Sequence, residues 1–275
     1  MINSYGFRKF KNRFFFIICA ICVIIAVVPL ASILFEVVRN GVPQLSLTFI
    51  TARNSGGGIG PAIQGTLILI GLTSLIGIPI GILSGVYLSE FGDNKYAQSL
   101  RTINNILTQF PSIIVGITAY GIIVLTLGTF SAIAGAVALA FIMIPIVTRT
   151  TEESLKLIPN SIREASLALG AHKWRTTLSV VLPSAKSGLA TGILLAVSRI
   201  AGETAPLILT IAGNNYFFRG LNQPMAALPL EIWKDALQPY PAVQAQGWGA
   251  ALILILMVLT INIAVRLASR SRMKT

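Results

Sequence analysis

Long apolar runs alternate with short polar stretches along the whole of this chain, which has 275 residues. Each run approaches the ~20 apolar residues that a helix needs to cross roughly 30 Å of hydrocarbon. The pattern therefore predicts an all-α membrane protein with six transmembrane helices. We expect residues 1–13 to form a basic N-terminal tail, residues 14–270 one transmembrane domain, and residues 271–275 a C-terminal tail. The predicted spans are Phe14–Phe35, Ile63–Leu88, Ile103–Leu127, Phe130–Val147, Gly188–Ile211 and Trp248–Leu267.

The second predicted span contains glycines at intervals of four residues: Gly77, Gly81 and Gly85. Residues at this interval share one helix face, and small side chains there let a neighbouring helix approach closely within lipid. Pro79 removes a backbone donor from the same helix and permits a bend. We expect this span to be a packing helix of the bundle.

The polar stretch between the fourth and fifth spans, residues 158–183, has the pattern of two short helices. Asn160 and Ser161 are suitable N-cap residues, and apolar residues then recur at helical spacing up to Gly170. Glycine commonly ends a helix, and the apolar periodicity resumes beyond it. We expect this segment to lie outside the bilayer and to dock on another protein.

Charge supports the membrane assignment and fixes an expected orientation. Charged residues make up 11% of the chain, against about 25% in soluble domains. The net charge of +12 could suggest nucleic-acid binding, but 16 of the 21 basic residues fall in the two tails and in the loops on one side of the predicted bundle. This asymmetry predicts that both termini are cytoplasmic, with no nucleic-acid partner. The first apolar run is too long for the h-region of a signal peptide, so we expect it to be retained as a span.

Two opposite charges, Arg199 and Glu203, lie within the fifth span. Each costs roughly 2.5–3.5 kcal/mol at the centre of a bilayer unless it is paired or hydrated. Their spacing of four residues places them on one face, and Pro206 is expected to interrupt the helix beside them. They either line a substrate path or form a structural ion pair. Arg149, at the end of the fourth span, either joins that path or reaches the membrane surface as a snorkelling side chain.

Other candidate chemistry is sparse. The glycine-rich tract before the second span lacks the Lys-Ser/Thr of a P-loop, and no P-loop occurs elsewhere. We therefore expect no nucleotide hydrolysis by this chain. Cys19 and Cys22 form a C-x-x-C pair without a second ligand pair, and His172 is the single histidine. We interpret the cysteines as packing residues and the histidine as a contact or exposed residue, so no metal site or catalytic residue is expected.

The external loop between the last two spans, residues 212–247, is long and rich in aromatic residues and prolines. Within it, Ala226–Leu237 has helical spacing with an apolar stripe. An interfacial anchor, an outer gate and a contact for an external protein are all compatible with this composition, and the anchor is the interpretation that we favour.

The polar segment resembles the EAA loop of ABC importer permeases, which contacts an ATPase subunit as a coupling helix. The family pattern is Glu-Ala-Ala, three residues, Gly, nine residues, Ile or Leu, and a Leu-Pro ending. The matching positions here are Glu164, Ala165, Gly170, Leu182 and Pro183, with Ser166 in place of the second alanine. Four further stretches resemble the permeases of phosphate-specific ABC importers: Gly57–Thr66, Pro111–Gly116, Arg149–Glu152 and Arg199–Pro206.

This resemblance implies a type I, MetI-like permease core in a bacterial cytoplasmic membrane. It implies ATP-driven import of inorganic phosphate, with ATP and Mg²⁺ used by a separate ATPase and no cofactor bound by this chain. The implied partners are a homologous second permease (PstC-like), an ATPase dimer (PstB-like) and an external phosphate-binding protein (PstS-like). It places Arg149, Arg199 and Glu203 at positions associated with transport.

Two other functions compete with this interpretation. An ion-coupled secondary transporter or channel for a small anion would use Arg199 and Glu203 as a switch, and it would be expected to carry an inverted repeat, which is not visible. A membrane-embedded enzyme or scaffold would need a nucleophile or metal cluster. The mechanism that we expect instead is a lever, in which the ATPase moves residues 161–175 and the third to fifth spans follow.

Overall fold

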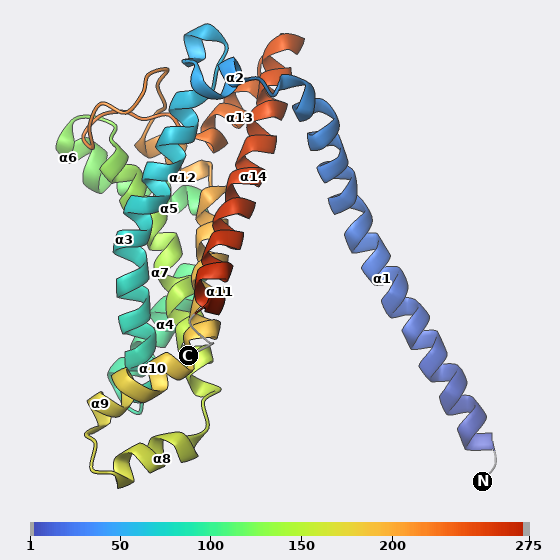
Figure 1. The fold of residues 1–275 in the computed structure, drawn as a ribbon, viewed down its shortest axis with the longest axis vertical. Coiled ribbons are helices and arrows are strands. Elements are labelled where there is room, and N and C mark those ends of the chain that lie inside the picture. Colours follow the sequence, from blue (N-terminus) through green and yellow to red (C-terminus); the bar gives the residue numbers. More distant parts are fainter. Residues whose placement is uncertain (1–2, 272–275) are drawn as a thin grey trace.

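The computed structural model describes residues 3–271, which are helical almost throughout (Figure 1). The long helices are α1 (Asn3–Gly41), α3 (Gly60–Glu90), α7 (Ala132–Lys156) and α14 (Pro241–Ser271). The shorter α-helices are α2 (Leu47–Thr51), α4 (Lys95–Gln109), α5 (Ser112–Ala119), α6 (Leu125–Leu127), α8 (Asn160–Ala168), α9 (Lys173–Thr176), α10 (Leu182–Ser184), α11 (Lys186–Ala201), α12 (Ala205–Thr210) and α13 (Leu228–Ala236). Four other helical turns connect them: η1 (Val42–Gln44), η2 (Asn54–Gly56), η3 (Tyr120–Val124) and η4 (Thr177–Val181).

Six membrane spans can be drawn through these elements. Four helices are long and apolar enough to cross a bilayer alone: α1, α3, α7 and α14. Two bent pairs of helices supply two further apolar lengths, one from α4 to α6 and one from α9 to α11. Counting each bent pair as one span gives six, which agrees with the number predicted from the apolar runs.

The third predicted span, Ile103–Leu127, is wrong as a continuous helix. The chain turns by 103° between Lys95–Gln109 and Ser112–Leu127. Phe110 and Pro111 are extended at this turn, with ψ of 132° and 130°. The cause is the proline, because its ring excludes the helical conformation from the residue before it.

The fifth predicted span, Gly188–Ile211, is also divided. Helix α11 ends at Ala201, and α12 begins at Ala205 with Pro206 in its first turn. The expected interruption beside Pro206 is present, because proline fits the first turn of a helix but not its interior. The apolar length of the span hid the three non-helical residues between the two helices.

Helix α1 stands apart from the bundle. It already begins at Asn3, so residues 3–13 of the expected tail are helical, and it continues past the predicted end of the span to Gly41. None of its most apolar 18-residue window is buried. Near its C-terminal end, Gly41 lies close against Trp248 and Leu252 of α14. Residues 1–2 and 272–275 lie outside the described residues, and with them most of the predicted C-terminal tail.

The bundle is centred on the contact between α3 and α7. A Cβ atom added at Gly77 would lie 2.9 Å from Met143 Sδ, and one at Gly81 would lie 2.6 Å from Val147 Cβ. Gly85 meets Thr151 in the same way one turn further on. The expected packing role of these glycines is therefore confirmed. Around this contact the main apolar core joins α3, α7, α11, α12 and α13.

The end of the molecule that holds α2 and α13 is organised by the first turn of α3. Thr66 Oγ1 accepts a hydrogen bond from Leu228 N at 2.8 Å, and Gln64 Oε1 accepts one from Phe218 N at 2.9 Å. A bridge between Ala212 and Met225 closes the loop that connects α12 to α13. One face of α13 is buried in the bundle, so this helix forms an inner layer that closes one end of the bundle.

Candidate functional site

The ion pair between Arg199 and Glu203 lies where α11 ends. Arg199 is in the last turn of α11, and Glu203 is in the break before α12. Arg199 Nη2 is 2.9 Å from Glu203 Oε1, but the Arg199 side chain is 61% exposed and that of Glu203 only 8%. The buried Glu203 Oε1 makes no aligned hydrogen bond, so the attraction is mainly one of charge. The exposed guanidinium keeps N–H groups available for an anion.

Close packing holds the break that carries this pair. A Cβ atom at Gly116 of α5 would lie 2.7 Å from Pro206 Cα. Two of the stretches that carry the family resemblance, Pro111–Gly116 and Arg199–Pro206, therefore meet in the fold. Contact with α5 fixes the start of α12, and the ion pair to Glu203 orients the Arg199 side chain.

Arg149 occupies a separate level of the bundle. Its Nε donates a hydrogen bond of 2.9 Å to Glu153 Oε1 on the next turn of α7, and both side chains are exposed. Helices α7 and α11 are antiparallel, with Gly192 against Thr150. Position 199 is seven residues beyond Gly192, which is roughly 10 Å along the helix axis. The structure therefore gives each arginine its own carboxylate and does not bring the two arginines together.

The coupling segment projects from the bundle as α8 (Figure 1). Its exposed face includes Glu164, Ala165 and Leu167, and the side chain of Leu169 just beyond the helix is 90% exposed. Gly170 has a φ of +82°, in the left-handed region that favours glycine, so the predicted end of the first helix is confirmed. An apolar and acidic face that protrudes in this way suits a groove on another protein.

The start of this helix differs from the prediction. Pro159 is the N-cap residue, Asn160 is already helical, and no side chain caps the first turn. Proline fixes a backbone conformation from which a helix can begin, so it takes the place that Asn160 or Ser161 was expected to hold.

Leu182 and Pro183 lie at the base of the bundle. Leu182 packs against the buried cluster formed by Leu155, Val181, Ala185 and Leu189, whereas Pro183 is exposed. Leu182 therefore anchors the second half of the segment, while Glu164 and Ala165 stand on its outer face.

Two buried ion pairs at the same end of the molecule escaped the sequence analysis. Arg163 binds both carboxylate oxygens of Glu90, at 2.8 and 3.2 Å, across 73 positions of sequence. Arg101 Nε donates to Glu152 Oε1 at 2.8 Å across 51 positions. The available signal was the scarcity of acidic residues, nine in the whole chain, with Glu90 and Glu152 each following an apolar run. Hydropathy could not say which arginine each would meet.

The opposite end of the molecule holds two buried carboxyl groups on α13. Burial raises the pKa of Asp235 to about 6; the neighbouring charge of Glu231 adds to this effect, and Lys234 opposes it. Burial also raises the pKa of Glu231, against Lys234 and a hydrogen bond donated by Asn54 Nδ2. These two carboxyl groups therefore bind protons at a higher pH than ordinary carboxylates do.

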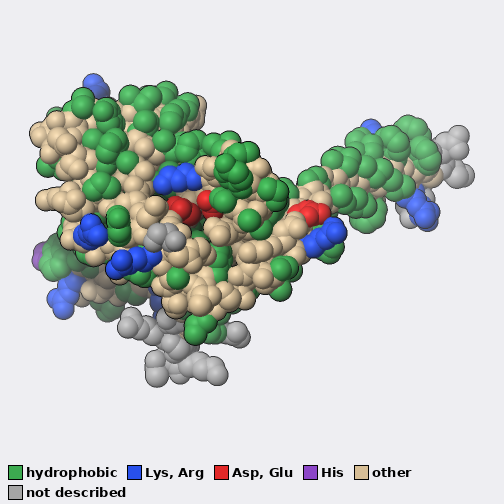
Figure 2. Space-filling model, turned by 90° about the horizontal axis from the view of Figure 1, so that it is seen from above, with side chains coloured by type: hydrophobic (Ala, Val, Ile, Leu, Met, Phe, Trp, Pro, Cys, Tyr) green, Lys and Arg blue, Asp and Glu red, His purple; other side chains and the backbone are tan. Residues whose placement is uncertain are grey.

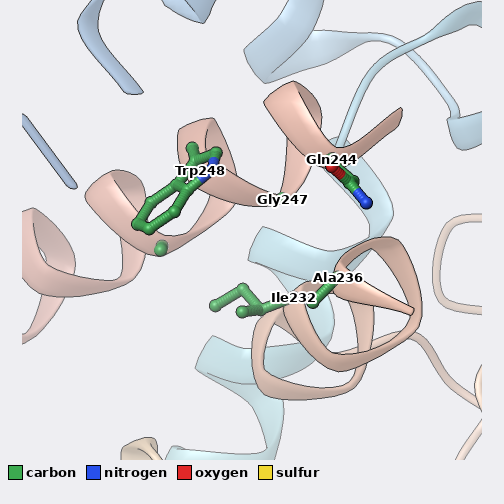
Figure 3. Close-up of a pocket in the computed structure, with 6 residues that line it drawn as sticks. Ile232, Ala236, Gln244, Gly247 and Trp248 are labelled. Atoms are coloured by element: carbon green, nitrogen blue, oxygen red, sulfur yellow. The ribbon is translucent and has the colours of Figure 1, made fainter. Parts of the chain in front are cut away.

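A mainly apolar cavity of about 280 Å³ lies between α13 and α14. Figure 3 shows Ile232 and Ala236 of α13 on one side and Gln244, Gly247 and Trp248 of α14 on the other. None of its lining residues is charged. The cavity lacks a group that would bind an oxyanion, so it is separate from the Arg199 site.

The remaining candidates form no site in the described part of the chain. Cys19 and Cys22 are free and exposed on α1, and His172 is exposed before α9. Within residues 3–271, no three histidine, cysteine or carboxylate side chains gather as metal ligands.

Comparison with known families accounts for this arrangement. Residues 77–273 match the model of the family described as binding-protein-dependent transport system inner membrane component. The chain belongs to this family. The match begins in α3 and includes the coupling segment, both bent spans and α14, so the permease core of an ABC importer is present.

Curated relatives of this permease match over almost their full lengths. A Haemophilus influenzae protein named phosphate transport system permease protein PstA is 42% identical over 94% of both chains. A Methanocaldococcus jannaschii protein named probable phosphate transport system permease protein PstA is 38% identical over 97% of this chain and 96% of its own. The permease is thus similar to PstA proteins from a bacterium and from an archaeon.

Solved structures support the fold of the permease. A chain of the MetNI methionine ABC transporter, in an inward-facing conformation, has a TM-score of 0.64 at 21% identity, over 82% of this permease and 99% of that chain. A chain of a bacterial alginate ABC transporter, in complex with an alginate-bound periplasmic protein, has a TM-score of 0.72 at 16% identity, over 98% of both. At these identities the likeness establishes the all-α fold alone.

Proposed function

We propose that this chain is the permease subunit of an ABC importer that moves inorganic phosphate across the cytoplasmic membrane. The observation that carries the proposal is the 42% identity, over 94% of both chains, with a phosphate transport system permease. The extent of the match matters because a match over 94% of this chain is too long to leave out a whole span.

The Arg199 site has the chemistry that phosphate needs. Phosphate is a tetrahedral oxyanion, and a planar guanidinium can bind two of its oxygens at once. Glu203 is nearly buried and pairs with the arginine from one side, so the exposed part of the guanidinium would be left to contact the substrate. A single exposed arginine binds an anion weakly enough to release it, which a conducting path requires. Arg149 would provide a second, separate contact along that path.

The partners follow from surfaces that this chain leaves uncovered. The exposed face of α8 would dock on a PstB-like ATPase dimer, where ATP and Mg²⁺ are used. The unburied length of α1 would pack on lipid and on a PstC-like second permease, because hydrophobic side chains cover its visible surface (Figure 2). A PstS-like phosphate-binding protein would deliver the anion at the end that holds α2 and α13.

The expected orientation suits this assembly. The beginning of α1 and the end of α14 point towards the same end of the molecule as α8 (Figure 1). With the ATPase in the cytoplasm, both termini would be cytoplasmic, as the distribution of basic residues predicts.

The decisive experiment is transport by the complete importer in proteoliposomes. We expect uptake of radiolabelled phosphate that needs ATP inside the vesicle and the binding protein outside it, and that excess sulfate does not inhibit. The ion-coupled alternative predicts uptake by this chain alone under an ion gradient, without ATP. ATP-independent uptake, or equal uptake of sulfate, would reject the proposal.

The coupling role has its own test. Gly170→Pro cannot adopt a φ of +82°, because the proline ring fixes φ near −65°. We expect this variant to insert normally but to hydrolyse ATP with at least a tenfold loss of phosphate uptake. A glycine-to-proline change elsewhere, such as Gly6→Pro, is not a suitable control, because Gly6 lies in a helix that proline would disrupt. The control is instead Gly170→Asn, because asparagine tolerates the left-handed conformation. Full uptake by Gly170→Pro would contradict the lever.

A further inference from the structure

The α8 end of the bundle carries a crossed pair of arginine clamps. Each arginine binds the C-terminal carbonyl groups of one long helix and a carboxylate that belongs to the other. The two long helices are α3 and α7, and the two arginines are supplied by α8 and α4.

The first clamp is Arg163, which comes from the coupling helix. Its guanidinium donates to the carbonyl oxygens of Leu155 and Ile158, at 2.9 and 2.5 Å, where α7 ends. The same guanidinium binds the carboxylate of Glu90, the last residue of α3. The Arg163 and Glu90 side chains are only 18% and 5% exposed, so solvent screens their attraction little.

The second clamp is Arg101, which comes from α4. It donates to the carbonyl oxygens of Leu88 and Gly92, at 2.6 and 3.1 Å, where α3 ends. Its Nε binds Glu152 of α7, which also pairs with Lys156. Gly92 leaves the necessary room, because a Cβ atom there would lie 2.7 Å from Arg101 Nη2.

Along their length, α3 and α7 are held too closely to slide. Gly77, Gly81 and Gly85 receive side chains of α7 at three successive turns. Interdigitated packing of this kind resists sliding, because each displaced side chain would meet backbone. The clamps and the glycine seam together make α3 and α7 one rigid pair.

On the proposed function, the ATPase moves α8, and the movement needs a route into the membrane. The inner side of α8 faces the bundle through Arg163 and through Ser166, whose hydroxyl bonds that of Thr176 at 2.9 Å. Ser166 ties α8 only to the segment that follows it, whereas Arg163 reaches across to α3. The outer face, with Glu164 and Ala165, remains available for the ATPase.

We propose that Arg163 and Glu90 form the linkage that transmits movement of the coupling helix to the rigid α3–α7 pair. Arg101 and Glu152 are positioning residues that keep the ends of this pair in register. The linkage gives the coupling helix a direct contact with the second span, in addition to its chain connection to the fourth span. It makes Arg163 a positioning residue for transport, since it touches neither phosphate nor ATP.

The test compares Glu90→Gln with the wild-type importer, assembled from all its subunits in proteoliposomes. Glutamine has the same shape but lacks the charge, so the bidentate ion pair is lost while the carbonyl contacts of Arg163 remain. We expect unchanged recovery of ATPase with the permease, ATP hydrolysis within about twofold of wild type, and at least a fivefold fall in phosphate transported per ATP hydrolysed. The matched control is Glu36→Gln, which removes an exposed carboxylate of α1, and it should leave this ratio unchanged.

A double variant separates linkage from folding. Arg163→Gln strands the buried Glu90 charge and should lower the yield of assembled complex. Adding Glu90→Gln to it should restore assembly but not the transport-to-ATP ratio, because both act on one linkage. A normal ratio in Glu90→Gln overturns the proposal, and so does a fall in uptake fully explained by lost assembly. Failure of the wild-type importer to take up phosphate would instead reject the proposed function.

Discussion

Two arginine–glutamate pairs in this permease have the same chemistry and opposite designs. Arg163 and Glu90 are 73 residues apart, nearly buried and joined through two hydrogen bonds. Arg199 and Glu203 are four residues apart, and the arginine is mostly exposed. A buried long-range pair fixes two elements relative to each other, since neither charge can be solvated alone. A local pair with an exposed arginine leaves that arginine free to bind something else.

The contrast shows that the free-energy cost of placing a charged side chain in the membrane does not by itself reveal the role of that side chain. Insertion energetics drew attention to Arg199 and Glu203, because they lie within an apolar run. Glu90 lies at the end of such a run and Arg163 lies in the polar segment of residues 158–183, so neither stood out. Their burial, which comes only from the fold, makes them the more constrained pair.

The largest expected difference is in stability. Arg163→Ala leaves the carboxylate of Glu90 buried and without its partner, which should cost about 3–5 kcal/mol. Arg199→Ala also leaves a buried carboxylate without its partner, that of Glu203, but it removes a mostly exposed arginine that makes one contact, so we expect a smaller loss of about 1–2 kcal/mol. Denaturation midpoints of the purified permease in mixed micelles measure both. Equal losses would erase the distinction between the two pairs.

The glycine seam should be the next most sensitive feature. Gly85→Val places methyl groups where Thr151 Cβ already lies 2.5 Å from an added Cβ atom, so we expect a loss of roughly 1–3 kcal/mol. Gly71→Val on the same helix meets nothing within 4 Å and serves as the control. If both variants lose the same stability, the seam does not hold α3 against α7.

Phosphate uptake per assembled importer should depend more on Arg199 than on the residues whose replacement costs more stability. Arg199→Ala removes the guanidinium that we propose lines the path, and we expect about a tenfold loss of phosphate uptake, or about 1.4 kcal/mol on the barrier. Arg199→Lys keeps the charge without the planar fork, so its phosphate uptake should lie between that of the wild type and that of Arg199→Ala. Radiolabelled uptake, corrected for the amount of assembled importer, is the measurement. Uptake at the wild-type rate in Arg199→Ala would show that the ion pair has only a structural role.

The smallest effect is expected from the buried carboxyl groups of α13. Because the folded-state pKa of Asp235 is raised to about 6, the folded protein binds its proton more tightly than the unfolded chain does. The resulting penalty to stability is present in full above pH 6 and disappears as the pH falls towards 3.8, the ordinary pKa of an aspartate. Asp235→Asn should therefore raise stability by roughly 1 kcal/mol at pH 7.5 and have little effect near pH 4. A gain that does not depend on pH would contradict this account.

Prediction from the sequence succeeded where one chain property decides the outcome. Apolar length gave the number of spans, glycine spacing gave the face of α3 that packs, and Gly170 gave the end of the first coupling helix. It failed at Phe110–Pro111, because hydropathy averages over a break, whereas the interruption beside Pro206 was expected from the proline itself. The N-cap of α8 was misplaced because Pro159 competed with two good capping residues.

The sequence by itself determined that this chain lies in a membrane, that it belongs with ABC importer permeases, and which polar residues occur inside the bilayer. These properties depend on composition and on spacing over a few helical turns. Only the tertiary structure decided that Arg163 meets Glu90, that Arg101 meets Glu152, and that Arg149 stays apart from Arg199. Such pairings depend on how distant helices pack, because a charge that is removed from water is stable only beside the partner that the fold provides.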